Sequence, residues 1–313
     1  MSQHTLTSAS NSNAAWVGFA LVSALSFAGM AVGVRLASQS LPLSEVVFFR
    51  NFIALLVLLP LVMRNHTSLK TNHFPLHVLR AGGGILATYC YFYALDNLHV
   101  ADALLLNYTS PIFIALFAVV WLKENWTLHR RVALGLSLLG LALLFRPSSD
   151  LFSVAGLSGL CSGALAGMAL TTVKRLTSTD DPISIVVWFA LISSIVTAVP
   201  MFWFFEWPQP MAWLWLLLVG CCGSLGQLSL TWAYQRAPVT QVSPLGYSSL
   251  IFAGFFGYIL WDELTDLVGF IGIVCISIAG IVVARERSIP APQPPSTVPI
   301  ISAESDSQPN TKT

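Results

Sequence analysis

Apolar residues occur along this chain in long runs that short polar segments separate. The runs are about 20 residues long, the length that a helix needs to cross the hydrocarbon core of a bilayer. Several of the separating segments contain proline, aspartate or asparagine, which favour turns. The pattern predicts ten helices, at residues 15–36, 43–63, 76–96, 101–121, 130–146, 153–174, 183–205, 211–234, 239–260 and 266–284.

The composition supports a location in a membrane. Hydrophobic residues make up 55% of the 313 and charged residues only 9%, whereas soluble globular proteins have about 25% charged residues. A soluble fold would need a far more polar surface. We therefore expect an all-α polytopic membrane protein with ten transmembrane helices and the lipid bilayer as its surroundings.

The two ends of the chain are polar. Residues 1–14 contain no Lys or Arg, so they lack the basic start of a signal peptide, and we expect them to form an N-terminal tail. Residues 286–313 are rich in Pro and Ser, which predicts a disordered tail.

Basic residues are unevenly distributed between the two sides of the predicted helices. The side with both termini holds eleven of the fifteen, the opposite side holds Arg35 and Arg146, and Arg50 and Arg80 lie within helices. Short loops rich in Lys and Arg stay in the cytoplasm. Both termini are therefore expected to be cytoplasmic, most simply at a bacterial inner membrane.

The chain contains an internal repeat. When it is shifted by 139 residues, 94–124 aligns with 233–263 without a gap, and nine of the 31 pairs are identical, among them Tyr108/Tyr247 and Glu124/Glu263. Such self-similarity indicates a duplicated unit. We therefore divide the chain into repeat 1 at 15–146 and repeat 2 at 153–285.

Each repeat holds five helices, an odd number, so the second repeat enters the membrane upside down. This inversion explains a charge reversal in the repeated segment: WLKENWTLHRR at 121–131 is basic, whereas LWDELTD at 260–266 is acidic. Inverted repeats are a common plan of secondary transporters, whose substrate site lies between the halves. The sequence lacks H-E-x-x-H and G-x-x-x-x-G-K-[ST], so a metalloprotease or an ATP-driven pump is not indicated, and we expect no enzyme activity.

Three segments resemble the EamA type of drug/metabolite transporter. They are ALSFAGMAVGVRLASQSLPLSEVVFFRNFIAL, YFYALDNLHVADALLLNYTSPIFIALFAVVWLKE and TWAYQRAPVTQVSPLGYSSLIFAGFFGYILWDE. The resemblance covers residues 15–285. It implies ten helices, cytoplasmic termini and a central cavity lined mainly by helices 1, 3, 4, 6, 8 and 9. SEVVFFRNFIALLVLLPLVM and HVLRAGGG are similar to carriers of S-adenosylmethionine, and other members export amino acids or metallophores derived from them.

Arg50 is the most informative side chain. It lies about two turns into the second helix, where a charge is costly unless it reaches the headgroups, pairs, or meets a ligand. Snorkelling to the headgroups and pairing with a substrate carboxylate or a gating acid both stay open. Arg80 is only a turn from a helix end, and there we expect snorkelling.

Polar and aromatic residues within the spans are further candidates for the substrate site. Each has an ordinary alternative, either hydrogen bonding between helices or a place in the interfacial aromatic belt. Beside Arg50, the candidates are Tyr93, Asn107, Tyr108, Gln227, Trp232, Gln241, Ser243 and Tyr247.

Deep carboxylates are absent from the predicted spans, so proton coupling has little support. Asp102 is the best-placed candidate, and exchange or facilitated diffusion are alternatives. His73 and His77 are separated by Pro75, which breaks the helix that would align them for a metal, and we expect both at the interface. No metal, cofactor or nucleic acid is indicated, and a monomer and a homodimer are both compatible with the sequence.

These observations favour a secondary transporter that moves a small zwitterionic metabolite by alternating access. Export of an amino acid, or of a compound derived from one such as a metallophore, is the leading interpretation. Uptake or exchange of a compound like S-adenosylmethionine, and drug efflux, are the alternatives.

Overall fold

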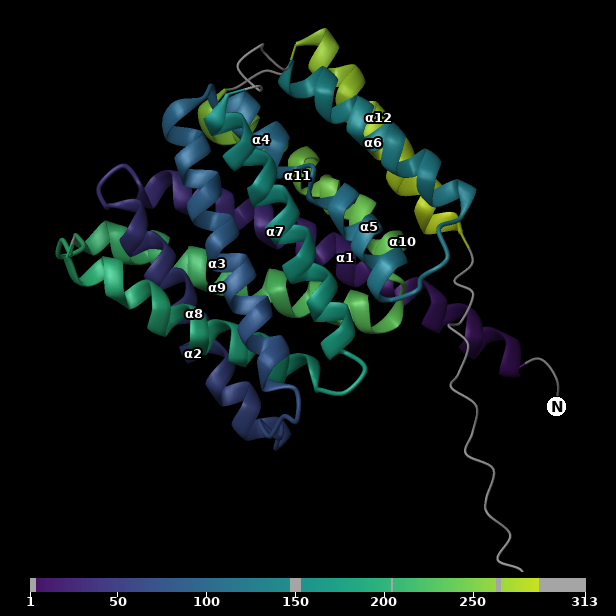
Figure 1. Ribbon diagram of the computed structural model, residues 1–313, viewed down its shortest axis with the longest axis horizontal. Coiled ribbons are helices and arrows are strands. Elements are labelled where there is room, and N and C mark those ends of the chain that lie inside the picture. Colours follow the sequence, from purple (N-terminus) through teal and green to yellow (C-terminus); the bar gives the residue numbers. More distant parts are fainter. Residues whose placement is uncertain (1–3, 147–152, 204, 263–265, 287–313) are drawn as a thin grey trace, which may run out of the picture.

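The computed structural model describes residues 4–146, 153–203, 205–262 and 266–286, and every regular element in these ranges is a helix (Figure 1). The expected all-α fold is therefore confirmed. The helices are α1 (His4–Ala37), α2 (Leu43–Asn65), α3 (Phe74–Asn97), α4 (Val100–Asn107), α5 (Ser110–Trp121), α6 (Leu128–Phe145), α7 (Val154–Leu176), α8 (Pro182–Trp203), α9 (Pro210–Arg236), α10 (Val239–Val242), the 3-10 helix η2 (Ser243–Tyr247), α11 (Ser248–Trp261) and α12 (Leu267–Arg285).

Nine membrane-spanning candidates are found within the described ranges by length and hydropathy. The helix α3 has 24 residues but is not among them, because Arg80 and three consecutive glycines lower its hydropathy. The helix α1 begins at His4, whereas its apolar, membrane-spanning part begins at Ala15. Residues 287–313 of the tail predicted at 286–313, and the repeat residue Glu263, lie outside the described residues.

Two of the predicted spans are interrupted. The span predicted at 101–121 consists of α4 and α5, and the one predicted at 239–260 consists of α10, η2 and α11. Pro111 lies in the first turn of α5 and Pro244 lies in η2. Because proline has no amide hydrogen, it removes a helical hydrogen bond at each place. The interruptions bring polar residues to corresponding positions of the two repeats.

The packing of the helices follows the internal repeat. The helix α1 packs along α9, and the corresponding helices of the other repeat, α7 and α3, pack in the same way. The helix α2 packs on its counterpart α8, and α6 packs on its counterpart α12. Figure 1 shows α6 and α12 side by side at one edge of the bundle. Each helix of one repeat thus packs on a helix of the other, and corresponding helices of the two repeats make corresponding contacts.

Glycines permit the closest helix contacts. Gly163 and Gly167 of α7 face the interruption between α4 and α5, and a Cβ on Gly167 would lie 2.7 Å from the Cβ of Phe113. Gly140 of α6 and Gly272 of α12 meet so closely that a Cβ on either would lie 2.5 Å from the carbonyl oxygen of the other. Small residues are the expected means of such approach in a membrane.

A polar cluster ties the two repeats together near the start of α6 and the end of α12. Glu124 accepts hydrogen bonds from the backbone amides of Val239 (2.9 Å) and Thr240 (3.1 Å) and from the Thr240 hydroxyl (2.8 Å). Arg130 donates to the same hydroxyl (2.9 Å) and pairs with Glu286 (3.2 Å). We call Glu124, Arg130, Thr240 and Glu286 the end cluster.

Candidate functional site

A cavity of about 520 Å³ lies between the two repeats. Its lining comes from α1, α2, α3, α7, α8, α9 and both interrupted spans, and no described residue of α6 or α12 contributes. The helices α2 and α8, the second and seventh predicted spans, are not among the lining helices that the family resemblance implied, and they also line the cavity. The lining runs from Leu43 and Ser44, where α2 begins, to Tyr234 near the end of α9.

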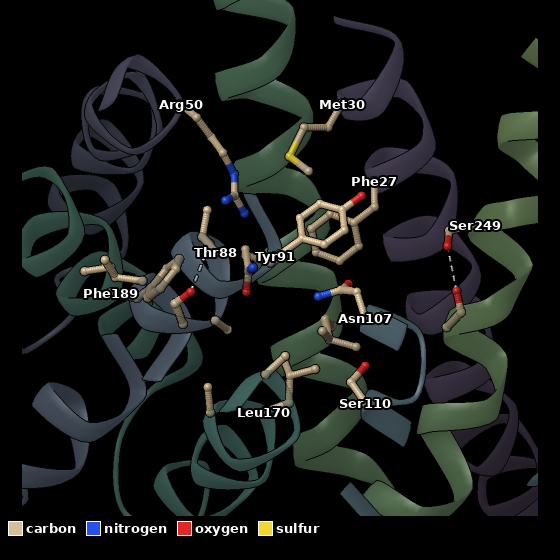
Figure 2. A pocket seen from close by; sticks show the side chains of 18 of the residues that line it. Phe27, Met30, Arg50, Thr88, Tyr91, Asn107, Ser110, Leu170, Phe189 and Ser249 are labelled. Carbon is tan, nitrogen blue, oxygen red and sulfur yellow. Dashed lines mark hydrogen bonds between the residues drawn. The ribbon is translucent and has the colours of Figure 1, made fainter. Parts of the chain in front are cut away.

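Arg50 is one of the two charged residues in this lining. It projects from α2 beside Gly223 of α9, and Figure 2 shows its guanidinium reaching into the space between Met30 and Thr88. Within the part of the chain that the structure describes, no hydrogen bond or ion pair to Arg50 is found. The side chain therefore reaches the cavity rather than the headgroups, and it offers all its N–H donors there.

Arg80 is the other charged residue of the lining, and the expectation that it snorkels is wrong. Its side chain is buried, with 4% exposed. One terminal nitrogen donates to Gln227 Oε1 at 3.0 Å, and the guanidinium carbon lies 4.1 Å from the centre of the Phe189 ring. Its Nε has no partner among the described residues. Because α3 turns Arg80 toward α9, the charge points into the bundle instead of along the helix to its end.

The interrupted spans contribute polar groups that are also bonded between helices. Asn107 donates to the hydroxyl of Ser162 in α7 (3.0 Å), and the Tyr247 hydroxyl donates to the carbonyl oxygen of Tyr108 (2.7 Å). Asn107, Tyr108, Ser243 and Tyr247 all line the cavity. Interhelical hydrogen bonding and a place in the substrate cavity were alternatives for these residues. In the structure, Asn107 and Tyr247 bond to other helices and also form part of the cavity wall.

Three residues predicted for the substrate site lie elsewhere. Tyr93 is 48% exposed and does not line the cavity, whereas Tyr89 and Phe92 of the same helix do. Trp232 packs against Phe19, with ring centres 5.3 Å apart. Gln241 is fully buried and is not part of the cavity lining, and its amide donates to the carbonyl oxygens of Val283 and Glu286.

Asp102, predicted for coupling, is buried at 2% exposure and is not part of the cavity lining. Its place near the start of α4 explains this, because the lining begins only at Asn107 in that span. The coupling role stays a prediction, now without direct access to the cavity.

Sequence reasoning missed one face of α3. Gly84, Thr88 and Tyr91 line the cavity together with Arg80, and Figure 2 shows Tyr91 and Thr88 directed into it. These residues are four, eight and eleven positions after Arg80, the spacing of one helical face. The inward orientation of Arg80, which only the structure shows, is what identifies them.

The charge of the cavity is one-sided. Arg50 and Arg80 are cationic, and no described lining residue is acidic. The remaining polar lining comes from amide, hydroxyl and phenol groups, including Asn51, Gln227 and Ser193. The wall is otherwise apolar and aromatic, with Phe27 and Phe189 among its side chains. Such a cavity is suited to a small molecule that is partly apolar and carries negative charge.

His77 was expected at the interface but is buried, with 1% exposed. Its Nε2 lies 2.7 Å from Oδ2 of Asp180, in the connection between α7 and α8. Burial acts to raise the pKa of Asp180, but hydrogen bonds from Thr71, His77 and Thr179 outweigh it and hold that pKa below its ordinary value. This pair links the two repeats outside the cavity.

Comparisons with known proteins agree with this architecture. The model of the EamA-like transporter family matches residues 14–146 and 154–285. The chain is 31% identical to the pseudopaline exporter CntI of Pseudomonas aeruginosa strain UCBPP-PA14 over 86% of this chain and 95% of that protein. It is 28% identical to a riboflavin transporter of Brucella anthropi (79% and 90% covered) and 26% identical to an S-adenosylmethionine uptake transporter of Rickettsia bellii (80% and 86% covered).

The fold is shared with a solved crystal structure. The TM-score is 0.76 at 17% identity, and the match covers 85% of this chain and 95% of the other. The three named relatives carry chemically different compounds. The substrate must therefore be argued from the residues of the cavity.

Proposed function

Because this chain belongs to the EamA-like transporter family, we propose that it exports a small amino-acid-derived metabolite whose carboxylate binds Arg50 in the central cavity. The chain is an integral membrane transporter and not an enzyme. We further propose a bacterial inner membrane as its location, with both termini in the cytoplasm, as the distribution of Lys and Arg indicates.

The observation that carries the proposal is the Arg50 guanidinium, which lines the cavity without a partner among the described residues. An unpaired charge in a membrane protein is costly, and a ligand that compensates it gains that energy. Carboxylates suit the planar fork of arginine, with two parallel hydrogen bonds. The exporter among the relatives supports the direction, and alternating access between two repeats supplies the mechanism.

Uptake or exchange of a compound like S-adenosylmethionine is the second candidate, supported by the relative from Rickettsia bellii. The positive charge of the cavity disfavours such a substrate. Such a substrate carries a sulfonium cation in addition to the ammonium and carboxylate of an amino acid, so a net positive charge would enter a space with two arginines and no described acid. Efflux of cationic drugs meets the same objection.

The test compares cells that lack this protein with cells to which it has been restored, by untargeted mass spectrometry of cell extracts and medium. The proposal predicts a carboxylate-bearing compound that accumulates inside the deleted cells and disappears from their medium. A compound that instead lingers in the medium of the deleted cells would make the protein an importer and overturn the proposed direction.

A further inference from the structure

The cavity holds a second cation that one carboxylate does not neutralise. Arg80 projects from α3 and Arg50 from α2, and both line the same space. Their like charges act on each other across it. Arginine stays protonated in proteins, so the cavity has a formal charge of +2 from its described lining. A single carboxylate would leave one of these charges uncompensated.

The protein contacts of Arg80 orient it but do not neutralise it. Gln227 accepts one hydrogen bond, and the Phe189 ring covers one face of the guanidinium. Both groups carry no net charge. The Nε of Arg80 is buried without a partner, a state that is rare for buried polar atoms. The side chain is therefore held in place with part of its donor capacity unused.

The arrangement differs from a structural ion pair elsewhere in the chain. Arg130 is also 4% exposed, but it pairs with Glu286 and donates to Thr240 and to the carbonyl oxygen of Asn125. Arg130 lies outside the cavity, in the end cluster. The buried arginine without an acid is thus the one that faces the cavity, which indicates that its counter-charge comes from the ligand.

We propose that the transported substrate carries two carboxylates, one for Arg50 and one for Arg80, on a scaffold that fits against the aromatic wall. This inference rests on the proposed function and narrows its substrate class from carboxylate-bearing metabolites to diacids. Because the two guanidinium groups come from different helices, a diacid would also join α2 to α3 when it binds. The amide of Gln227 fixes the fork of Arg80 for the second carboxylate.

The first experiment measures binding to the full chain in lipid nanodiscs with two isosteric probes. One is N-(carboxymethyl)-L-phenylalanine, which has two carboxylates and an aromatic ring. The other is N-(carbamoylmethyl)-L-phenylalanine, in which an amide replaces one carboxylate. We expect the diacid to bind about tenfold or more tightly than the amide, the ratio that loss of one charge-assisted hydrogen bond produces. Equal binding of both probes, or binding of neither, would overturn the proposal.

The second experiment repeats the comparison in Arg80→Gln, Arg80→Lys and Arg131→Gln. Arg80→Gln is expected to abolish the preference for the diacid, and Arg80→Lys to retain part of it, since the charge remains while the fork is lost. Arg131 is exposed outside the cavity, so Arg131→Gln should preserve the preference. A preference that survives in Arg80→Gln contradicts the assignment.

Folding of the variants is checked by thermal unfolding without ligand. Removal of an unpaired buried charge should leave Arg80→Gln at least as stable as the wild type. The two proposals also fail separately. An exported compound with one carboxylate would overturn the diacid proposal and support the proposed export. Tight diacid binding without any export in cells would overturn the proposed export and support the diacid site.

Discussion

The Tyr247 hydroxyl donates a hydrogen bond of 2.7 Å to the carbonyl oxygen of Tyr108, the residue at the corresponding position of the other repeat. Both residues lie where a span is interrupted, and their rings are 6.1 Å apart. The same position of an inverted repeat thus supplies a donor from one half and an acceptor from the other. The contact joins the halves at the wall of the cavity.

Tyr247→Phe is expected to lower the stability of the protein. The change removes only the donor of this partly buried hydrogen bond and leaves the carbonyl of Tyr108 without it, at a cost of about 1–3 kcal/mol. Thermal unfolding in detergent measures this. Tyr258→Phe is the matched control, because Tyr258 lies in α11, which directly follows η2, and is 52% exposed. Indistinguishable melting of the two variants would show that the contact contributes nothing.

If the end cluster closes one end of the cavity, Glu124→Ala is expected to open it. The variant removes three hydrogen bonds to Val239 and Thr240, and charge-assisted bonds contribute about 1.5–3 kcal/mol each. A cysteine placed at Val242, in a chain without its native cysteines, should then react about tenfold faster with an impermeant maleimide applied to the side that holds the termini.

The control for this experiment is Glu206→Ala, because the Glu206 side chain is exposed beside α8 and α9, away from the end cluster. In Glu206→Ala, the cysteine at position 242 should be labelled at the same rate as in the chain with an intact end cluster. If Glu124→Ala and Glu206→Ala label alike, the end cluster does not close the cavity.

Stability should depend on pH through Asp180. Hydrogen bonding holds the pKa of this carboxyl below its ordinary value, despite burial, so the charged form is favoured in the folded state. Its contribution is present above the ordinary pKa of about 3.9 and is lost as the pH falls through the folded value. Unfolding temperatures of wild type and Asp180→Asn should therefore converge below about pH 4.

Asp96→Asn serves as the control for the pH experiment, since Asp96 is exposed at the far end of α3. We expect its curve to follow the wild type throughout. A constant difference between wild type and Asp180→Asn from neutral pH to pH 3 would exclude a titrating carboxyl as the cause.

Gly140→Leu should destabilise the pair of α6 and α12. A Cβ there would come within 2.5 Å of the Gly272 carbonyl oxygen, and overpacking costs about 1–3 kcal/mol or more. Gly135→Leu on the same helix has nothing within 4 Å of its Cβ position and should be neutral or stabilising, because leucine favours helix. Thermal unfolding compares the two, and equal melting would contradict this packing.

Much of the fold follows from the sequence alone. Run length gives the helices, the 139-residue shift gives the repeat, and the odd helix number gives the inversion. Pro111 and Pro244 lie where two of the predicted spans are interrupted. Asn107 and Ser243, near these interruptions, line the cavity. These features follow from local chemistry and duplication, so one sequence suffices to find them.

The site was harder to predict, because it depends on which way each helix face turns. Arg80 is a turn from a helix end, and its position along the helix says nothing of its rotation toward Gln227. Gln241 was a candidate for the cavity because it is a polar residue within a predicted span, but its amide instead donates to carbonyl oxygens at the end of α12. Tyr93 comes one turn after Tyr89, yet it is exposed outside the cavity, while its neighbour Phe92 lines it.

The central claim is tested most directly by the export of the identified compound from cells that carry Arg50→Gln. Deleted cells are given the wild type, Arg50→Gln or Arg131→Gln, and the compound is measured by mass spectrometry in cells and medium. We predict that Arg50→Gln leaves the compound inside, with export reduced about tenfold or more, while Arg131→Gln exports like the wild type. Export by Arg50→Gln at the wild-type rate would contradict the account, since the cavity arginine would then play no part in binding the substrate.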